Sequence, residues 1–141
     1  MKFEHFYGPG APSHNFISWV TEQIKENVQQ IKLTDCTQKR EFLYINDAVS
    51  ALITVIQNLE ELSSFESITI GTGNPIVLRD LLFMARDIFG STSTFNFGAI
   101  PLPPNQKDLD FYDHSQIREL GWQANESLES GLLKIKKQIN E

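Results

Sequence analysis

The sequence predicts a single α/β domain. Its 141 residues are enough to bury roughly two-thirds of the unfolded chain's surface in one core, without disulfides or a structural metal. Short segments rich in β-branched and aromatic residues alternate with longer segments whose apolar residues recur at helical spacing. We find no internal repeat and no polar linker long enough to divide the chain.

Composition narrows the function classes. Eighteen acidic against twelve basic residues give a net charge of −6, which argues against a nucleic-acid-binding domain. No apolar run approaches the roughly 20 residues of a membrane span, and the first residues lack the apolar stretch of a signal peptide. The single cysteine, Cys36, favours a reducing compartment. We therefore expect a cytoplasmic protein without a membrane or nucleic-acid partner.

The first third of the chain predicts strands around one helix. Residues 2–7 have the aromatic content of a strand, although nothing precedes them to pair with. A helix is expected over residues 15–29, where Phe16 and Trp19 serve packing. Alternation at 31–33 and an apolar run at 40–45 predict two strands, and the polar turn between them indicates a hairpin.

The next helix is predicted from its cap and its apolar stripe. Asn46 or Asp47 supplies an N-cap oxygen, so Asp47 is expected to be a helix cap, and Tyr44 just before it a core residue. The helix carries apolar residues at helical spacing and ends in a loop over residues 60–64; these apolar residues are Val49, Leu52, Ile53, Ile56 and Leu59.

The remaining elements follow from turn and cap residues. A strand at 67–70 ends in a glycine turn, a helix at 78–89 is stopped by Gly90, and a strand follows at 94–97. Prolines 101, 103 and 104 predict an irregular stretch. A short helix at 115–120 precedes a last helix, which is capped by Ser127, continues to Gln138 and has an apolar stripe of Leu128, Leu132, Ile135 and Ile139.

A search for catalytic or metal-binding motifs returns none. The one glycine-rich segment, Gly71-Thr72-Gly73, lacks the third glycine of a dinucleotide fingerprint, and Pro75 follows it, so we interpret it as a turn that ends a strand. His5, His14 and His114 are scattered, so no metal site is expected.

Four segments, in order, resemble the carboxy-terminal part of nucleotide-sugar epimerases and dehydratases of the extended short-chain dehydrogenase/reductase family. They cover nearly the whole chain. Residues 5–10 (HFYGPG) resemble the family's Asn-x-Tyr-Gly-Pro turn, and residues 39–49 (KREFLYINDAV) its Arg-Asp-Phe-x-Tyr-Val-x-Asp segment. Residues 70–75 (IGTGNP) are similar to its Asn-Ile-Gly-x-Gly strand end. Residues 120–122 (LGW) and 127–132 (SLESGL) are similar to its ending.

The resemblance implies that residues 1–141 form one substrate-binding domain, and that residues 1–7 correspond to a late strand of a Rossmann domain. The family's NAD(P) fingerprint and its catalytic Tyr-x-x-x-Lys lie upstream of the Tyr-Gly-Pro turn, and neither motif occurs in this sequence. The full-length family uses NAD or NADP. We expect neither cofactor to bind this chain alone, and we assign no catalytic residue.

The resemblance also implies substrate-binding residues. It places Arg40 on the family's diphosphate-binding arginine, although the residues alone would allow a solvated arginine at a strand edge. His5 occupies the position of a phosphate-contacting asparagine, where it either donates to the phosphates or caps a turn. The family's second phosphate arginine is missing from residues 100–105, which leaves Lys107 as a partial replacement.

Two functions therefore remain open. The chain is either the nucleotide-sugar-binding portion of an NAD(P)-dependent epimerase, dehydratase or reductase, inactive alone, or a non-enzymatic binding or assembly module that retains the fold. In both cases, surfaces that a Rossmann half would cover should be exposed. Exposed apolar patches promote association, so we expect a homodimer or larger assembly.

Overall fold

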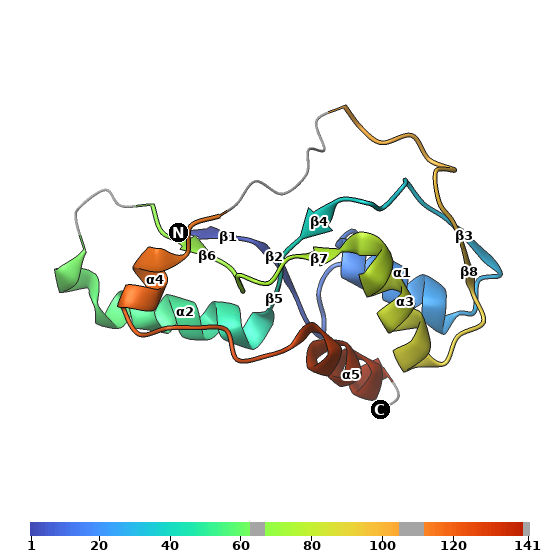
Figure 1. Ribbon diagram of the computed structural model, residues 1–141. Coiled ribbons are helices and arrows are strands. Elements are labelled where there is room, and N and C mark those ends of the chain that lie inside the picture. The colour runs from blue at the N-terminus through green and yellow to red at the C-terminus, as the bar shows by residue number, and fades with distance from the viewer. Residues whose placement is uncertain (63–66, 105–111, 140–141) are drawn as a thin grey trace.

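The computed structural model describes residues 1–62, 67–104 and 112–139 and confirms the α/β fold class (Figure 1). The strands are β1 (Lys2–Phe3), β2 (His5–Tyr7), β3 (Gln30–Lys32), β4 (Lys39–Arg40), β5 (Phe42–Tyr44), β6 (Thr69–Ile70), β7 (Ile76–Val77) and β8 (Thr94–Asn96). The helices are α1 (Phe16–Lys25), α2 (Ile45–Gln57), α3 (Leu78–Phe89), α4 (Ser115–Glu119) and α5 (Leu128–Ile139), with a 3-10 turn η1 (Leu59–Glu61) after α2.

The strands pair across long sequence separations, and the predicted hairpin is wrong. Strand β3 lies parallel to β8, β4 antiparallel to β7, and β5 parallel to β2. The sequence pattern located most of the strands, because it reports which side chains are buried, but it missed β7, and the strand expected at 40–45 is divided into β4 and β5 and ends where α2 begins at Ile45. The pattern carries no information about which strand completes the backbone hydrogen bonds, and here distant segments do so.

The segment at the amino end is divided between two pairings. Strand β1 pairs in parallel with β6, while β2 pairs in parallel with β5, with Tyr7 in register with Tyr44. The division falls at Glu4, which belongs to neither strand and is buried. The first residues thus find partners among later strands of the same chain.

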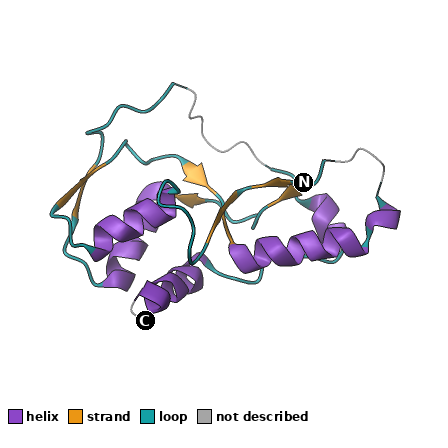
Figure 2. Ribbon diagram, turned by 180° about the vertical axis from the view of Figure 1, so that it is seen from behind, coloured by secondary structure: helices purple, strands orange, loops and turns teal. Residues whose placement is uncertain are grey.

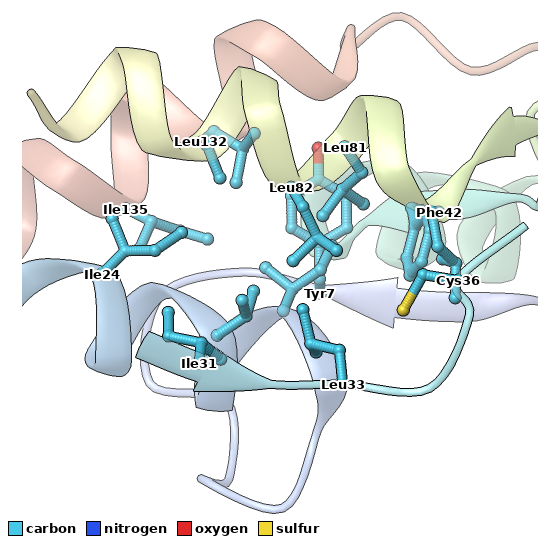
Figure 3. Close-up of a cluster of buried hydrophobic side chains, with 14 of the residues drawn as sticks. Tyr7, Ile24, Ile31, Leu33, Cys36, Phe42, Leu81, Leu82, Leu132 and Ile135 are labelled. Carbon is cyan, nitrogen blue, oxygen red and sulfur yellow. The ribbon is translucent and has the colours of Figure 1, made fainter. Parts of the chain in front are cut away.

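Two hydrophobic cores lie on either side of β5. We call the first the α3 core, because α3 packs there with α1, α5 and β3 (Figure 3). We call the second the α2 core, formed by α2 with β6, Ile117 of α4 and Trp122. Successive strand residues point to opposite faces, so Phe42 and Tyr44 enter the α3 core while Leu43 enters the α2 core. Figure 2 shows the two groups of helices at opposite ends of the molecule, with strands between them.

The α3 core closely follows the sequence prediction. Helix α3 buries Leu78, Leu81, Leu82 and Ala85, and it ends at Gly90 in the left-handed region, with φ 69°. Helix α1 is shorter than expected, ending at Lys25. Phe16 and Trp19 pack against this core as predicted.

Helix α5 also matches its prediction. The Ser127 Oγ accepts the Ser130 N–H at 3.1 Å, which confirms the cap. Leu132 and Ile135 are buried, and Leu128 packs against the same core; the side chain of Ile139 lies outside the described residues.

The predicted cap of α2 is wrong. The helix begins at Ile45 with Tyr44 as N-cap residue, and no side chain caps it. Asp47 lies in the first turn instead, where its Oδ2 accepts the N–H groups of Asn125 at 3.1 Å and Glu126 at 2.9 Å. Tyr44 is a core residue, as predicted.

The apolar stripe that the sequence places on α2 lies at the surface. Its five residues are 43 to 58% exposed: Val49, Leu52, Ile53, Ile56 and Leu59. The buried face carries the smaller side chains Ala48 and Ala51 together with Val55. Apolar residues therefore occupy more of the surface of α2 than the rest of the described chain covers, and the larger of them lie on the exposed part. Within the described residues, no helix is both long and apolar enough to cross a membrane.

Candidate functional site

Arg40 lies at the end of β4, which joins the molecule through an antiparallel pairing with β7. Its register partner there is Ile76, and its Nη1 donates to the Lys39 carbonyl oxygen at 2.6 Å. The side chain is half-buried, whereas Lys39 is exposed. In extended backbone, neighbouring side chains point to opposite faces, so Lys39 and Glu41 share one face of this segment and Arg40 has the other.

His5 lies on the neighbouring strand β2, in register with Phe42, and the two rings meet edge to face with centroids 5.8 Å apart. The His5 side chain reaches solvent. Even so, the surrounding protein lowers the pKa of His5 by disfavouring the charged ring, and the positive charge of Arg40 lowers it further. Arg40 therefore lies close enough to His5 for its charge to act on the ring.

A cavity of about 280 Å³ runs along β2 beside His5. Its walls include Asn15, Phe16 and Phe42, so it combines apolar and aromatic surface with a few polar groups. Ligand pockets typically have volumes of about 300 to 1,000 Å³. This cavity is therefore large enough for only part of a nucleotide-sized ligand. The third predicted site residue, Lys107, lies outside the described residues.

A buried ion pair, which the sequence analysis did not identify, lies on the other face of the same segment. The Glu41 Oε2 is 3.0 Å from the His114 Nε2, and both side chains are less than 5% exposed. The His114 Nδ1 is 3.2 Å from the Thr69 carbonyl oxygen, and Gly73 N–H donates to the same Glu41 oxygen at 3.0 Å. Both ring nitrogens of His114 therefore lie within hydrogen-bonding distance of oxygens of the protein.

This pair is a structural link and does not resemble a catalytic dyad, because both His114 nitrogens already have partners within the protein. Through His114, it connects the residue just ahead of α4 with Thr69 of β6 and with Glu41. A cavity of about 700 Å³ adjoins it, with Lys39 and Arg118 among its lining residues. The only available sequence signal was an acid next to the apolar run 42–45, and nothing in the sequence indicated a partner at residue 114.

Glu4 is a third buried acidic or histidine residue of this region, with 8% of its surface exposed. Burial raises the pKa of Glu4, and the nearby Glu41 carboxylate raises it further, while His114 and Arg40 act in the opposite direction. Glu4, at the break between β1 and β2, is therefore close enough to Arg40, Glu41 and His114 for their charges to act on its carboxyl group.

The glycine segment after β6 has the structural role that was predicted. An added Cβ at Gly71 would collide with the Glu41 carboxylate and the His114 ring, so the glycine permits this close approach. Gly73 adopts a φ of 72° and donates its N–H to Glu41. A carboxylate thus occupies the position that a phosphate would need, and the turn does not suit a dinucleotide pyrophosphate. Among the residues that the structure describes, no group of acidic, histidine or cysteine side chains could hold a metal ion.

Comparison with curated proteins finds relatives of about twice this length. The chain is 29% identical over 141 residues to CDP-abequose synthase of Salmonella typhimurium, a match that covers 99% of this chain and 47% of the relative. It is 23% identical over 137 residues to GDP-L-fucose synthase 1 of Arabidopsis thaliana, covering 91% of this chain and 41% of that protein. The chain therefore spans about half the length of these relatives.

Solved structures share the fold. The UDP-glucose 4-epimerase of Thermotoga maritima with UDP-glucose matches with a TM-score of 0.83 and 22% identity, over 98% of this chain and 44% of the epimerase. The GDP-mannoheptose C4 reductase of Campylobacter jejuni, with NADP bound, matches with a TM-score of 0.80 and 19% identity, over 99% of this chain and 48% of the reductase. The model of the NAD dependent epimerase/dehydratase family matches residues 1–71, half of this sequence. The chain belongs to that family.

Proposed function

We propose that this chain is the nucleotide-sugar-binding part of an NAD(P)-dependent epimerase, dehydratase or reductase, and that residues 1–141 act as one substrate-binding domain. The observation that carries the proposal is the placement of His5, which lines a partly aromatic cavity and is in register with Phe42, near Arg40, two residues ahead of Phe42 and close enough for its charge to act on the His5 ring. In this proposal, Arg40 binds the diphosphate and His5 supplies a second donor. The names of the relatives, which include a CDP-abequose and a GDP-L-fucose synthase, support a nucleotide-linked sugar as the ligand.

The chemistry of a diphosphate suits these two side chains. A guanidinium presents parallel N–H donors that match two phosphate oxygens, and charge-assisted hydrogen bonds are about twice as strong as neutral ones. His5 is held toward its neutral form by burial and by Arg40. A diphosphate arriving beside it would favour the protonated ring, so that binding would take up a proton.

We further propose that the isolated chain neither binds NAD(P) nor catalyses turnover. Hydride transfer belongs to the nicotinamide cofactor when it is bound, and the family's fingerprint and Tyr-x-x-x-Lys do not occur in these 141 residues. The occupied glycine turn, with Glu41 against Gly71 and Gly73, supports the same conclusion. We also place the protein in the cytoplasm, which fits a buried free thiol at Cys36.

Calorimetric titration of the purified chain with CDP-, UDP-, dTDP- and GDP-sugars tests the proposal. We expect at least one to bind, and Arg40→Ala to weaken that binding by about 10- to 100-fold, the equivalent of about 1.5 to 3 kcal/mol for a lost charge-assisted contact. Arg40→Lys should recover part of the affinity, because lysine keeps the charge but not the fork.

Lys39→Ala is the matched control, since it removes the same charge from the adjacent residue on the opposite face. Equal losses from Lys39→Ala and Arg40→Ala would mean non-specific attraction. If no nucleotide-sugar binds at all, the proposal fails and the non-enzymatic module is favoured. Turnover by the isolated chain with NAD(P) and any of these sugars would contradict the second proposal.

The pH dependence of binding tests the role of His5. Because its pKa in the free protein is lowered, we expect nucleotide-sugar affinity to rise as the pH falls from about 7.5 to 6, toward the ordinary histidine value near 6.5 and below. His5→Asn keeps a donor but has no titrating ring, so its affinity should stay flat over this range. A wild-type affinity that does not change with pH would limit His5 to a local structural role.

We also propose that the isolated chain forms homo-oligomers through its exposed apolar surface. The five exposed aliphatic residues of α2 and η1 support this, because contiguous apolar surface promotes association. Light scattering at micromolar concentration should give a mass of at least two chains. A single species with the mass of one chain would refute it.

A further inference from the structure

The cavity of about 700 Å³ beside the ion pair of Glu41 and His114 has no role in the function proposed above. Its walls come from residues 39–41, from the turn after β6 and from residues 112–119. Its volume lies within the range of about 300 to 1,000 Å³ that is typical of ligand sites. Arg40 is not among its described lining residues, because that side chain lies on the other face of the segment.

Two cationic side chains reach this cavity from segments far apart in the sequence. Lys39 comes from β4 and Arg118 from α4. The Arg118 guanidinium lies against the turn after β6, because a Cβ added at Gly73 would collide with its Nη2. Neither cation takes part in the ion pairs that the structure shows among its described residues. The net charge of −6 disfavours anions over the chain as a whole, so two such cations at one cavity indicate a local site for an anion.

Two exposed acids, Asp113 and Glu119, line the same cavity. The Asp113 Oδ1 accepts the Ser115 N–H at 2.9 Å. Hydrogen bonds from Ser115 lower the pKa of Asp113, and the nearby charge of Arg118 lowers it further, so Asp113 is a carboxylate at neutral pH. A carboxylate repels a bare anion but accepts hydrogen bonds from hydroxyl groups. A ligand that suits both the cations and the acids therefore carries hydroxyl groups together with its negative charge.

The other walls suit a ring that carries hydroxyl groups. Tyr112, which is 38% exposed, lines the cavity and offers an aromatic face against which the apolar side of such a ring can pack. A second cavity of about 240 Å³ adjoins the first and shares Arg118 with it. Its lining includes Thr72 and Gln123, whose hydroxyl and amide groups both donate and accept hydrogen bonds. Polar groups thus surround the cations on more than one side.

We propose that this cavity is a binding site for a small sugar phosphate, whose phosphate group contacts Lys39 and Arg118. The guanidinium and the ammonium group donate charge-assisted hydrogen bonds to the phosphate oxygens. The sugar hydroxyl groups donate to the carboxylates of Asp113 and Glu119, and the sugar ring packs on Tyr112. This site is separate from the proposed nucleotide-sugar site and does not depend on it, because the two lie on opposite faces of residues 39–41.

The first test is calorimetric titration of the chain with glucose 6-phosphate, inorganic phosphate and glucose, in a buffer without phosphate. We expect glucose 6-phosphate to bind at least about tenfold more tightly than inorganic phosphate, and glucose not to bind. Arg118→Ala and Lys39→Ala should each weaken this binding at least about tenfold, because each removes a charge-assisted contact. Both side chains are exposed, so both variants should fold. Lys137→Ala removes an exposed cation from α5 and is the matched control.

Two further variants separate the parts of the site. Tyr112→Ala should weaken the binding of glucose 6-phosphate but not that of inorganic phosphate, because only the sugar ring packs on the aromatic face. Arg40→Ala, which should weaken nucleotide-sugar binding, should leave the affinity for glucose 6-phosphate unchanged, so the two proposals fail independently. The proposal would be overturned by the absence of glucose 6-phosphate binding or by equal affinities for glucose 6-phosphate and inorganic phosphate. Equal losses from Arg118→Ala and Lys137→Ala would also overturn it.

Discussion

Helices α2 and α3 are nearly equal in length and start in the same way, yet they differ in how much of their apolar surface this chain covers. Helix α3 contacts α1 and α5, and its leucines 81 and 82 are fully buried. Helix α2 buries two alanines and a valine, while its four larger aliphatic residues stay exposed. Helix α3 thus has its leucines buried between neighbouring elements, whereas the larger aliphatic residues of α2 lie at the surface.

The comparison shows that the local sequence pattern predicts where a helix forms, whereas the tertiary packing decides which of its residues are buried. In both helices, apolar residues recur at helical spacing, and both helices form where that spacing predicts them. In α3 the leucines lie on the face that this chain buries, although Phe83 is 39% exposed, whereas the exposed side of α2 carries four large aliphatic residues. The spacing of apolar residues thus predicts that a helix forms, but not which of its apolar residues the chain buries.

The largest effect is expected when a leucine of α3 and a leucine of α2 are each replaced by alanine and the losses in the free energy of unfolding are compared. Leu82→Ala in α3 removes a fully buried side chain, and we expect a loss of about 2 to 5 kcal/mol in the free energy of unfolding. Leu52→Ala in α2, at 43% exposure, should change it by no more than about 0.5 kcal/mol. Urea denaturation measures both values. Similar losses would show that α2 is covered in solution.

An intermediate effect is expected from the acids in the first turns of these helices. Asp47→Ala removes the carboxylate that accepts two backbone N–H groups of the segment before α5, which should cost about 1.5 to 3 kcal/mol. Asp80→Ala removes an exposed acid from the same position in α3, where only the helix dipole is affected, at a cost of about 0.3 to 1 kcal/mol. Thermal melts of the two variants should differ accordingly. Equal melting temperatures of the two variants would show that the contacts of Asp47 with the segment before α5 do not stabilise the fold.

The smallest effect depends on pH and concerns Glu4, which lies between β1 and β2. The pKa of Glu4 is raised in the folded chain above its usual value of 4.5, mainly by burial and then by Glu41. The folded state therefore favours the protonated form. The stability that protonation provides is fully present below the usual value and is lost as the pH rises through the raised one.

Glu4→Gln should accordingly raise the free energy of unfolding at pH 7 and change little at about pH 4. Urea denaturation across this range measures the difference. Glu22→Gln on α1 removes the same charge from an exposed position and is the control. A benefit of Glu4→Gln that is the same at both pH values would point to a cause other than titration.

The elements were more predictable from the sequence than their partners. Gly90 and Ser127 act locally, so the ends that they define were predicted correctly. The pairing of β3 with β8 and the ion pair of Glu41 with His114 join residues far apart in the chain, and no local pattern encodes such contacts. Arg40 and His5 were identified only through resemblance to a family, because an arginine at a strand edge has no distinctive local signature.

Strand β5 contributes side chains to both hydrophobic cores. Phe42 and Tyr44 contact one core and Leu43 the other, so a shift of this strand would disturb both cores at once. Arg40 lies just ahead of β5, and Ile45, immediately after it, starts α2. A displacement of these few consecutive residues would therefore change the position of Arg40, the packing of both cores and the start of α2 together.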